Sequence, residues 1–463
     1  MSSQLGLMGL GTMGSALARN LASRGFHVSV WNRSPEKTED FIRHFGESGF
    51  TGSPSLEEFV ESLEKPRKII LMVPAGGPVE ELLQDLLPLL ELGDAVMDGG
   101  NEHFRDTERF QESYITKGVL LLGCGISGGE EGALKGPSLM PGGDPQAWES
   151  FRPFLEAIAA EDFFGKACVS YMGKGGAGHF VKMIHNGIEY AEMQMLAEIY
   201  DVLKNLFRLS NDEIAEVFND WNESELNSYL LQASVDVLKQ KEADLFLLDV
   251  ISDEAGQKGT GVWTVEEALK LGVAAPSITE ALFIRMLSNQ THVRRPLHAQ
   301  FKEEAPVPNQ TVGNFTELAE KALLLLRLAH FDQGFSLLRE GNAYYEFGID
   351  LSEAARIWQG GCIIRSKILA PLNSALKEPA DSLFLYGFAE TIFKEGLPAL
   401  RQILSLTTGL GFATPVMSAG LQYIETLKRD RLPTTFIQAL RDRFGSHGYQ
   451  RIDREGVFHS QWK

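Results

Sequence analysis

The chain has 463 residues, enough for two or three domains, and with 44% hydrophobic and 23% charged residues its composition is that of an ordinary globular protein. A formal net charge of −19 argues against a nucleic-acid partner, and no apolar run is long enough to span a membrane. We expect a cytoplasmic protein, because the amino terminus lacks a secretory leader pattern. The three cysteines stand at unrelated spacings, which predicts reduced, buried thiols and no metal site.

Short apolar runs alternate with amphipathic stretches over the first 176 residues. Their periodicity predicts strands at residues 5–10, 27–31, 68–73, 95–97, 119–122 and 168–171, and helices at 13–23, 35–45 and 79–90. Strands and helices in alternation are typical of a doubly wound parallel sheet. Residues 1–176 are therefore predicted to form an α/β domain of Rossmann type.

A G-x-G-x-x-G motif, Gly9-Leu10-Gly11-Thr12-Met13-Gly14, joins the first predicted strand to the first predicted helix. In that context the first glycine permits a tight turn, the second lets a pyrophosphate approach the backbone, and the third lets helix and strand pack closely. The helix amino terminus then faces the anion. The motif predicts dinucleotide binding.

The second predicted strand ends at Asn32-Arg33-Ser34. An NAD enzyme usually has Asp or Glu there, which accepts a hydrogen bond from the ribose 2′-hydroxyl. Arg33 can instead pair with a 2′-phosphate and Ser34 can donate to it, so NADP is favoured over NAD. A solvated turn residue is the alternative interpretation of Arg33.

Two further glycine-rich loops, at residues 98–101 and 125–132, follow predicted strands at the carboxyl edge of the sheet. Their glycines expose backbone N–H groups, and Ser127 adds a hydroxyl, which suits a carboxylate or sugar hydroxyls. Tight turns without a ligand are the alternative interpretation.

From residue 177 to 431 the pattern is helical, which predicts a large all-α domain. Two helix starts, at residues 210–213 and 350–353, have capping-box sequences, and similar residues follow each of them. This likeness indicates two pseudo-repeated helical units, with chance similarity as the alternative. Residues 432–463 have scattered charges and aromatics but no long periodic run, which predicts a C-terminal arm.

One helical segment of this domain gathers polar residues on a single face. At helical spacing Lys182, His185, Asn186, Glu189 and Tyr190 fall within an arc of roughly 140°. Such a stripe either lies in solvent or lines a cleft. The cleft is favoured, because solvated faces are usually richer in flexible Lys and Glu than in His, Asn and Tyr.

The chain resembles the 6-phosphogluconate dehydrogenase family from its first strand to its last residues. The motifs that carry the resemblance are those above together with Met72-Val73-Pro74-Ala75, Gly136-Pro-Ser-Leu-Met-Pro-Gly-Gly143, Asp253-Glu-Ala-Gly-Gln-Lys-Gly-Thr-Gly261 and Arg441-Asp-Arg-Phe-Gly-Ser-His447. They occur in family order. The resemblance implies NADP-dependent oxidative decarboxylation of 6-phosphogluconate to ribulose 5-phosphate and carbon dioxide.

The resemblance also implies the two proton-transfer groups. Lys182 would be the general base that takes the proton of the 3-hydroxyl while hydride leaves carbon 3 for the nicotinamide. Glu189 would be the general acid that protonates carbon 1 of the enediol left by decarboxylation. To act as a base near neutral pH, Lys182 needs a pKa lowered from about 10.4 to roughly 7–8, which burial and neighbouring cations can supply.

The binding residues are implied in the same way. The cofactor would be held by Gly9, Leu10, Gly11, Thr12, Met13, Gly14, Asn32, Arg33, Ser34, Val73, Pro74, Ala75 and Asn101. The substrate's carboxylate and hydroxyls would contact Asn101, Ser127, Gly128, Gly129, His185 and Asn186, and its phosphate would contact Tyr190, Lys258, Thr260 and Arg285. Arg441 and His447 on the arm would complete the site of the partner subunit, which implies an obligate homodimer. No metal is expected.

Three positions depart from the family pattern. Leu134 replaces an expected Arg, Arg443 replaces an aromatic residue, and Glu80 replaces a common Asp. None of the three removes an implied catalytic group, although Leu134 and Arg443 bear on affinity or subunit contacts.

Two alternatives remain open from the sequence. A related β-hydroxyacid dehydrogenase, such as one acting on 3-hydroxyisobutyrate, would share the cofactor loop and catalytic lysine but lack the second helical half, the phosphate cations and the arm. A non-catalytic NADP-binding protein is the other alternative, and the retention of Lys182, Asn186 and Glu189 together argues against it.

Overall fold

The computed structural model describes residues 2–46, 49–257, 259–301, 307–308 and 310–462. Its amino-terminal part is built on a seven-stranded sheet. The strand order is β3-β2-β1-β4-β5-β6-β7, and all neighbours pair in parallel except β6 and β7. Its strands are β1 (Leu5–Met8), β2 (Val28–Trp31), β3 (Phe50–Gly52), β4 (Lys68–Leu71), β5 (Ala95–Asp98), β6 (Leu120–Ser127) and β7 (Ser138–Gly143). The order reverses between β1 and β4, which opens a crevice at their carboxyl ends.

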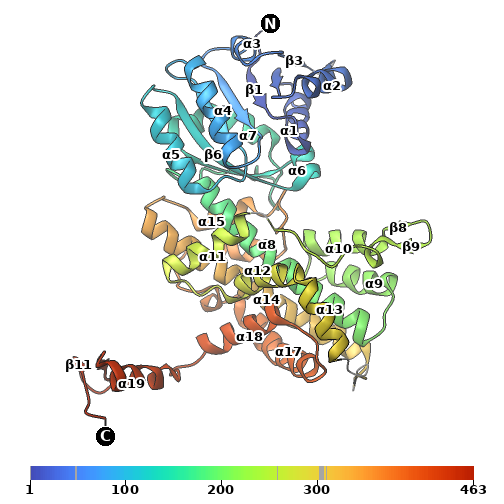
Figure 1. Ribbon diagram of the computed structural model, residues 1–463, viewed down its shortest axis with the longest axis vertical. Coiled ribbons are helices and arrows are strands. Elements are labelled where there is room, and N and C mark those ends of the chain that lie inside the picture. The colour runs from blue at the N-terminus through green and yellow to red at the C-terminus, as the bar shows by residue number, and fades with distance from the viewer. Residues whose placement is uncertain (1, 47–48, 258, 302–306, 309, 463) are drawn as a thin grey trace.

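Helices cover both faces of this sheet (Figure 1). They are α1 (Thr12–Ser23), α2 (Pro35–Phe45), α3 (Leu56–Glu61), α4 (Gly77–Leu86) with the 3-10 turn η2 (Leu87–Leu89), α5 (Phe104–Ile115), α6 (Gly129–Lys135) and α7 (Pro145–Ile158). Alternate residues of β1 serve two separate cores, because Leu5 and Leu7 pack with α1 and α7 while Met8 packs with α3, α4 and α5. The predicted Rossmann-type domain is therefore confirmed.

Two details of the sheet were predicted wrongly. Residues 168–171 form no strand, and this segment contributes only an isolated bridge between Val169 and Leu139 of β7. The short β3 and the antiparallel β7 were missed. The run Pro141-Gly142-Gly143 explains the second omission, because it lacks the side-chain alternation by which a strand is recognised.

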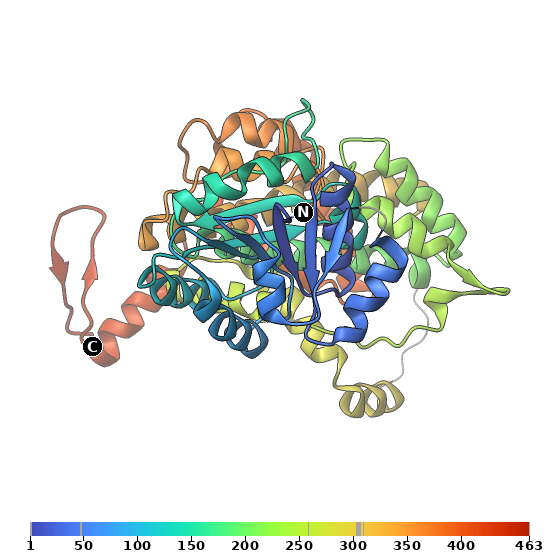
Figure 2. The same ribbon diagram turned by 90° about the horizontal axis from the view of Figure 1, so that it is seen from above.

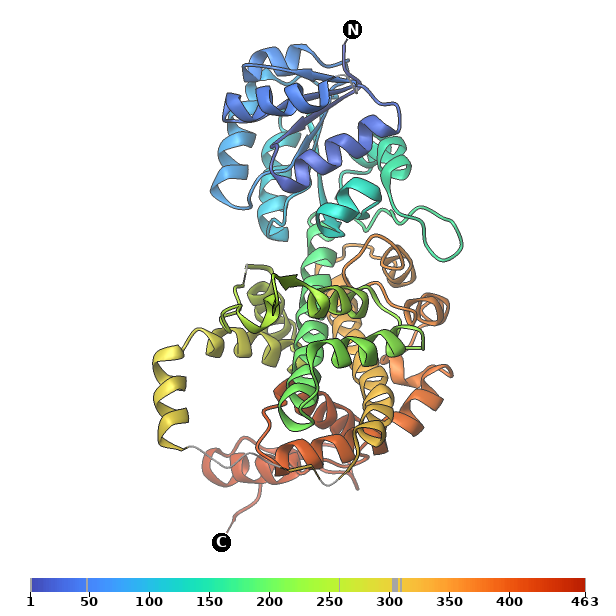
Figure 3. The ribbon, with the colours of Figure 1, turned by 90° about the vertical axis from the view of Figure 1, so that its right-hand side faces the viewer.

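The second part of the chain is helical and surrounds two long helices, α8 (Ala177–Asp201) and α14 (Val312–Tyr345). Figure 3 shows α8 leaving the sheet and running through the middle of the helical part. The other elements are the π-helical turn η3 (Val202–Leu206), α9 (Asn211–Asn222), α10 (Tyr229–Lys239), the hairpin β8 (Lys241–Glu242) and β9 (Leu245–Phe246), η4 (Leu247–Asp249), α11 (Gly259–Leu271), α12 (Pro276–Ser288), α13 (Thr291–Gln300), α15 (Leu351–Ile357), α16 (Leu369–Ala375), η5 (Leu383–Leu385), α17 (Ala389–Gly409) and α18 (Pro415–Leu427). No helix in the described ranges is long and apolar enough to cross a membrane.

Matched helix starts support the predicted pseudo-repeat. Helices α12 and α18 both begin with proline, and the residues before them, Ala275 and Thr414, have nearly the same backbone angles, φ −126° with ψ 59° and 58°. Each start is hydrogen-bonded to the long helix of the other predicted repeat unit: α12 to α14, and α18 to α8. Gln333 of α14 accepts a hydrogen bond from the first turn of α12 at 3.0 Å, and Glu198 of α8 accepts two from the first turn of α18 at 2.9 and 3.0 Å.

The two capping-box sequences behave differently. Ser210 and Glu213 form both reciprocal bonds of the box at the start of α9. Asp350 accepts from the first-turn amides of α15, but Glu353 pairs with Arg356 instead of returning a bond to Asp350. The second start is therefore capped from one side only.

The C-terminal arm contains more regular structure than the sequence predicted. It is formed by α19 (Thr434–Gly445) and a hairpin of β10 (Tyr449–Gln450) and β11 (Val457–Phe458), which stand apart from the body of the chain (Figures 1 and 2). The apolar residues of α19 lie at helical spacing but are exposed: Phe436, Ile437, Leu440 and Phe444. They pack into no core of their own chain. The helix was missed because it is short and follows a proline, and charged residues are scattered among its apolar ones.

Candidate active site

The first turns of α8 lie directly on β6 and β7 because glycines line the contact. A side chain at Gly125 of β6 would collide with the Cβ atom of Lys182, and one at Gly142 of β7 would collide with the backbone of Gly178. Glycine therefore lets the helix approach the sheet closely. This contact brings the polar face of α8 to the carboxyl end of β6.

Lys182 is almost fully enclosed, with 6% of the residue exposed. Burial lowers the pKa of its ammonium group, and the nearby charge of Glu189 opposes this effect only in part. The Nζ atom lies 3.4 Å from Nδ1 of His185. Burial and then the charge of Lys182 lower the pKa of His185 well below its usual value, so that its imidazole is neutral near pH 7. A lysine whose ammonium form is disfavoured by burial thus lies beside a neutral hydrogen-bonding ring.

Glu189 lies two turns farther along the same face of α8. Its side chain is 20% exposed, and Oε2 lies 3.8 Å from Nδ1 of His185. Burial raises the pKa of this carboxyl group, although Lys182 and Arg285 act in the opposite direction. A base with a lowered pKa and an acid with a raised pKa therefore share one enclosed surface, and the solvated-face alternative does not hold.

His185 connects this face to two other segments. Its Nε2 atom lies 3.0 Å from Oγ of Ser127 at the end of β6, and 2.8 Å from Sγ of Cys362 in the segment after α15. The backbone N–H of Ile363 also donates to Ser127 at 3.4 Å. Cys362 and Ile363 were missed from the sequence, because their contacts with the site exist only once the chain is folded.

The residues that the family resemblance assigns to the substrate phosphate lie around Asn186 and Tyr190 on the polar face of α8. The guanidinium carbon of Arg285 lies 3.5 Å from the ring centre of Tyr190, and Asn186 donates to Thr260 at 3.1 Å. Lys258 lies outside the described residues. Arg285 and Tyr190 form a stacked pair, and Nη1 of Arg285 also donates to the carbonyl of Gly256 at 3.2 Å.

Loops from the sheet domain border the same region. Gly128 and Gly129 follow Ser127 with φ of +119° and +63°, a backbone shape that favours glycine. Asn101 follows β5 and is exposed. Its neighbour Glu102 is buried and accepts a hydrogen bond from the backbone of Gly76 at 2.7 Å, which joins the Asn101 loop to the loop of Val73, Pro74 and Ala75.

Each glycine of the G-x-G-x-x-G turn meets a different need. Gly9 has φ +97°, and a side chain there would strike the carbonyl of Met72. A side chain at Gly14 would strike the carbonyl of Gly9, whereas Gly11 faces open space. Thr12 and Met13 begin α1, and Leu10 donates its backbone N–H to Asn32 at 3.0 Å. The turn is therefore closely packed except where a pyrophosphate would approach it.

A cavity of about 820 Å³ extends from this turn along the carboxyl edge of the sheet. Gly9, Gly11, Asn32, Arg33, Ser34, Val73 and Pro74 line it. The side chain of Arg33 is 83% exposed and lies 3.9 Å from Glu81, and the hydroxyl of Ser34 makes no capping bond to α2. Lys37 also lines the cavity and adds a second cation. It follows Ser34 by three residues and was missed from the sequence. These groups fit a dinucleotide with a phosphate on its ribose.

Arg441 and His447 are not brought to the site of their own chain. Both are exposed on the arm, which projects from the opposite end of the helical part (Figure 1). Among the departures, Arg443 is exposed on α19, Leu134 is half-buried on α6, and Glu80 forms a two-bond ion pair with Arg109. In the part of the chain that the structure describes, no three His, Cys, Asp or Glu residues are grouped to hold a metal ion.

The parallel sheet, its glycine turn and the cavity along its carboxyl edge define a dinucleotide-binding protein of Rossmann type. The model of the NAD binding domain of 6-phosphogluconate dehydrogenase matches residues 4–173, and that of the enzyme's C-terminal domain matches residues 178–462. The chain belongs to the 6-phosphogluconate dehydrogenase family.

Similar proteins cover the whole chain. The NADP(+)-dependent, decarboxylating 6-phosphogluconate dehydrogenase of Bacillus subtilis is 44% identical, and the decarboxylating enzyme of Escherichia coli is 42% identical, each over 99% of both chains. Among solved structures, 6-phosphogluconate dehydrogenase of Plasmodium falciparum superposes with a TM-score of 0.95 at 38% identity, covering 99% of this chain and 100% of the other. That enzyme is described in its apo form, with its cofactor NADP+ and with its substrate 6-phosphogluconate.

Proposed function

We propose that the chain converts 6-phospho-D-gluconate and NADP into ribulose 5-phosphate, carbon dioxide and NADPH. The observation that carries this proposal is the enclosed face of α8, where burial lowers the pKa of Lys182 and raises that of Glu189. The family match and the relative described with NADP+ and 6-phosphogluconate support the same substrate and cofactor.

The proposed steps assign one proton transfer to each group. Lys182, as a neutral amine, takes the proton of the 3-hydroxyl and so favours loss of hydride from carbon 3. Bound NADP supplies the acceptor for that hydride. The resulting 3-keto acid loses its carboxylate as carbon dioxide, and the electrons of the broken bond move toward the keto oxygen. Glu189 then delivers its proton to the carbon that carried the carboxylate, while the oxyanion of the resulting enediolate re-forms a carbonyl; this carbon becomes carbon 1 of ribulose 5-phosphate.

The other residues bind and orient the substrate in this proposal. Its carboxylate and hydroxyls contact Asn101, Ser127, Gly128, Gly129, His185 and Asn186, and its phosphate contacts Tyr190, Lys258, Thr260 and Arg285. Arg441 and His447 come from the partner's arm, so the active unit is a homodimer with shared sites. The division of the chain at residues 176/177 and 431/432 and a cytoplasmic location without nucleic-acid partners belong to the same proposal.

A coupled assay tests the reaction. NADPH and carbon dioxide are measured together with 6-phosphogluconate and each nicotinamide cofactor, and we expect them in equal amounts with NADP. A panel of short hydroxy acids, including 3-hydroxyisobutyrate, is run in parallel. Turnover of those acids in place of 6-phosphogluconate, or binding of NADP without release of carbon dioxide, would contradict the proposal.

Replacing Arg33 by alanine is expected to raise KM for NADP by about 10- to 100-fold, the effect of losing a charge-assisted bond to a phosphate. KM for NAD should change little, because NAD has no 2′-phosphate. The matched control is Arg43→Ala, which removes an exposed arginine of α2 that pairs with Asp40. Steady-state kinetics with both cofactors measure the effect, and an equal loss for NAD and NADP would remove Arg33 from 2′-phosphate recognition.

A further inference from the structure

The carboxylate of Asp442 is a fully enclosed acceptor in an arm whose other residues are mostly exposed. Its Oδ1 atom accepts from the backbone of Gly448 at 3.0 Å and lies 2.8 Å from Nδ1 of His459. Its Oδ2 atom accepts from the backbone of Ser460 at 3.1 Å and from Nε1 of Trp462 at 2.6 Å. Both oxygens therefore have two donors each, which come from the turn after α19 and from the terminal segment after β11.

The hydrogen bonds of this carboxylate join the segments of the arm, where α19 has no buried apolar residue. Of the twelve residues of α19, all of them described, Asp442 alone is buried. Desolvation by itself would raise the pKa of Asp442, but the bonds from His459, Ser460, Trp462 and Gly448 outweigh it and lower the pKa. The group is thus an anion that joins the end of α19, the turn after it and the terminal segment beyond β11.

The two residues assigned to the partner's phosphate site are held directly by this arrangement. Arg441 precedes Asp442 on α19, and His447 lies in the turn between Ser446 and Gly448. The backbone N–H of Ser446, at φ +50°, bonds to the carbonyl of Asp442, and the N–H of Gly448 bonds to its side chain. His447 is therefore fixed on both sides by one residue.

Gln438, one turn earlier on α19, bonds both to Arg441 and to the turn that carries His447. Its amide nitrogen donates to the carbonyl of Gly448, and its oxygen accepts from Arg441 at 3.1 Å. Two side chains of α19 thus bond to Gly448 in the turn: Gln438 to its carbonyl and the charged Asp442 to its N–H.

We propose that Asp442 is a positioning residue for the active site of the partner subunit, because its carboxylate fixes the spacing between Arg441 and His447. The inference rests on the proposed function, in which these two side chains reach the phosphate of 6-phosphogluconate across the dimer. Asp442 itself touches no substrate. Without its carboxylate the turn that carries His447 is released from α19, and the two side chains no longer meet one phosphate together.

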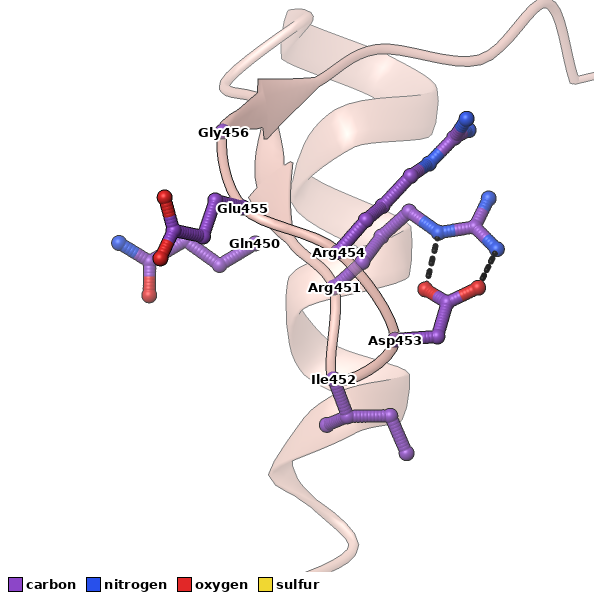
Figure 4. A pocket seen from close by; sticks show the side chains of 7 residues that line it. All are labelled: Gln450, Arg451, Ile452, Asp453, Arg454, Glu455 and Gly456. Atoms are coloured by element: carbon purple, nitrogen blue, oxygen red, sulfur yellow. Dashed lines mark hydrogen bonds and ion pairs between the residues drawn. The ribbon is translucent and has the colours of Figure 1, made fainter.

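The hairpin of the arm supplies a matched control. Figure 4 shows its turn, where Asp453 forms two bonds with Arg451, at 2.7 and 2.6 Å. This carboxylate is exposed and joins only residues of the turn. Asp453→Asn thus removes an aspartate charge from the same arm without touching α19 or His447.

The first test compares steady-state kinetics of purified dimers. We expect Asp442→Ala to raise KM for 6-phosphogluconate at least about tenfold, as for loss of a bond to a charged group, while KM for NADP stays within about twofold. Asp442→Asn should shift the same KM in the same direction but less, because an amide retains one acceptor oxygen. Asp453→Asn should match the wild type. A wild-type KM for 6-phosphogluconate in Asp442→Asn and Asp442→Ala, or an equal rise of both KM values, would overturn the proposal.

Mixed dimers provide the second test. When Asp442→Ala chains are combined with Lys182→Met chains, one of the two sites has an intact Lys182 and receives the intact arm of the other chain. We expect this dimer to recover the wild-type KM for 6-phosphogluconate. Retention of the high KM of Asp442→Ala would show that the substitution acts within its own subunit and would overturn the proposal. Failure of the proposed function is distinguished beforehand, because the wild-type enzyme would then release no carbon dioxide.

Discussion

Substitution of Lys182 by methionine is expected to lower kcat by about 10³- to 10⁴-fold, the upper part of the range for loss of a general base. Methionine resembles lysine in length and is apolar, so the enclosed position beside Gly125 should tolerate it. Far-UV circular dichroism and binding of NADP should therefore be unchanged. The loss is measured as NADPH and carbon dioxide formed from 6-phosphogluconate.

The substitution Lys182→Arg tests whether residue 182 acts as a proton acceptor or only as a positive charge. Arginine keeps the charge but does not lose its proton at accessible pH, so we expect it to be as inactive as methionine. The matched control is Lys174→Met, at an exposed lysine whose Nζ atom lies 3.9 Å from Glu346. Activity of Lys182→Arg near that of the wild type would contradict a base role and leave only an electrostatic one.

The wild-type pH profile follows from the same assignment. Lys182 accepts a proton only as the neutral amine, so activity should fall as pH decreases through its pKa. Because burial lowers that pKa from its usual value, the falling limb should lie on the acid side of where a free lysine would place it. An acid limb that persists unchanged in the residual activity of Lys182→Met would assign the limb to another group.

The features that could be predicted from sequence are local in the chain. The turn from Gly9 to Gly14 is fixed by three glycines within six residues, and helical periodicity alone places Lys182 and Glu189 on one face of α8. The same reasoning gave the two-part fold, since strand and helix patterns follow from side-chain alternation. These predictions needed no knowledge of which distant segments meet.

The features that could not be predicted depend on contacts between segments that are distant in the sequence. Cys362 contacts His185 across 177 residues of sequence, and no spacing or composition indicates it. The arm was expected to lack a long periodic element, because its charges and aromatic residues are scattered in the sequence, yet it forms the helix α19. The bonds of Asp442 were also hidden, since their donors are up to 20 residues away and become neighbours only when the hairpin folds back.

The second large effect is expected for Glu189→Gln, with kcat reduced by about 10²- to 10³-fold. Glutamine keeps the size and a hydrogen-bonding group but has no acidic proton to deliver to carbon 1. Gln at this site also removes a negative charge near Lys182, which should lower the pKa of the lysine further. Glu346→Gln, at the exposed partner of Lys174, is the matched control and should leave kcat unchanged.

Two readouts separate an acid from a structural role for Glu189. Because the enediol is protonated after hydride transfer, rapid mixing of Glu189→Gln with NADP and 6-phosphogluconate should give a burst of about one NADPH per site before slow turnover. In the wild type, activity should also fall as pH rises through the pKa of Glu189, which burial raises, since the carboxylate carries no proton to donate. Glutamine does not ionise, so this alkaline limb should vanish from the residual activity. A variant that shows no burst but keeps the limb would place Glu189 outside the protonation step, because the group that titrates would then still be present.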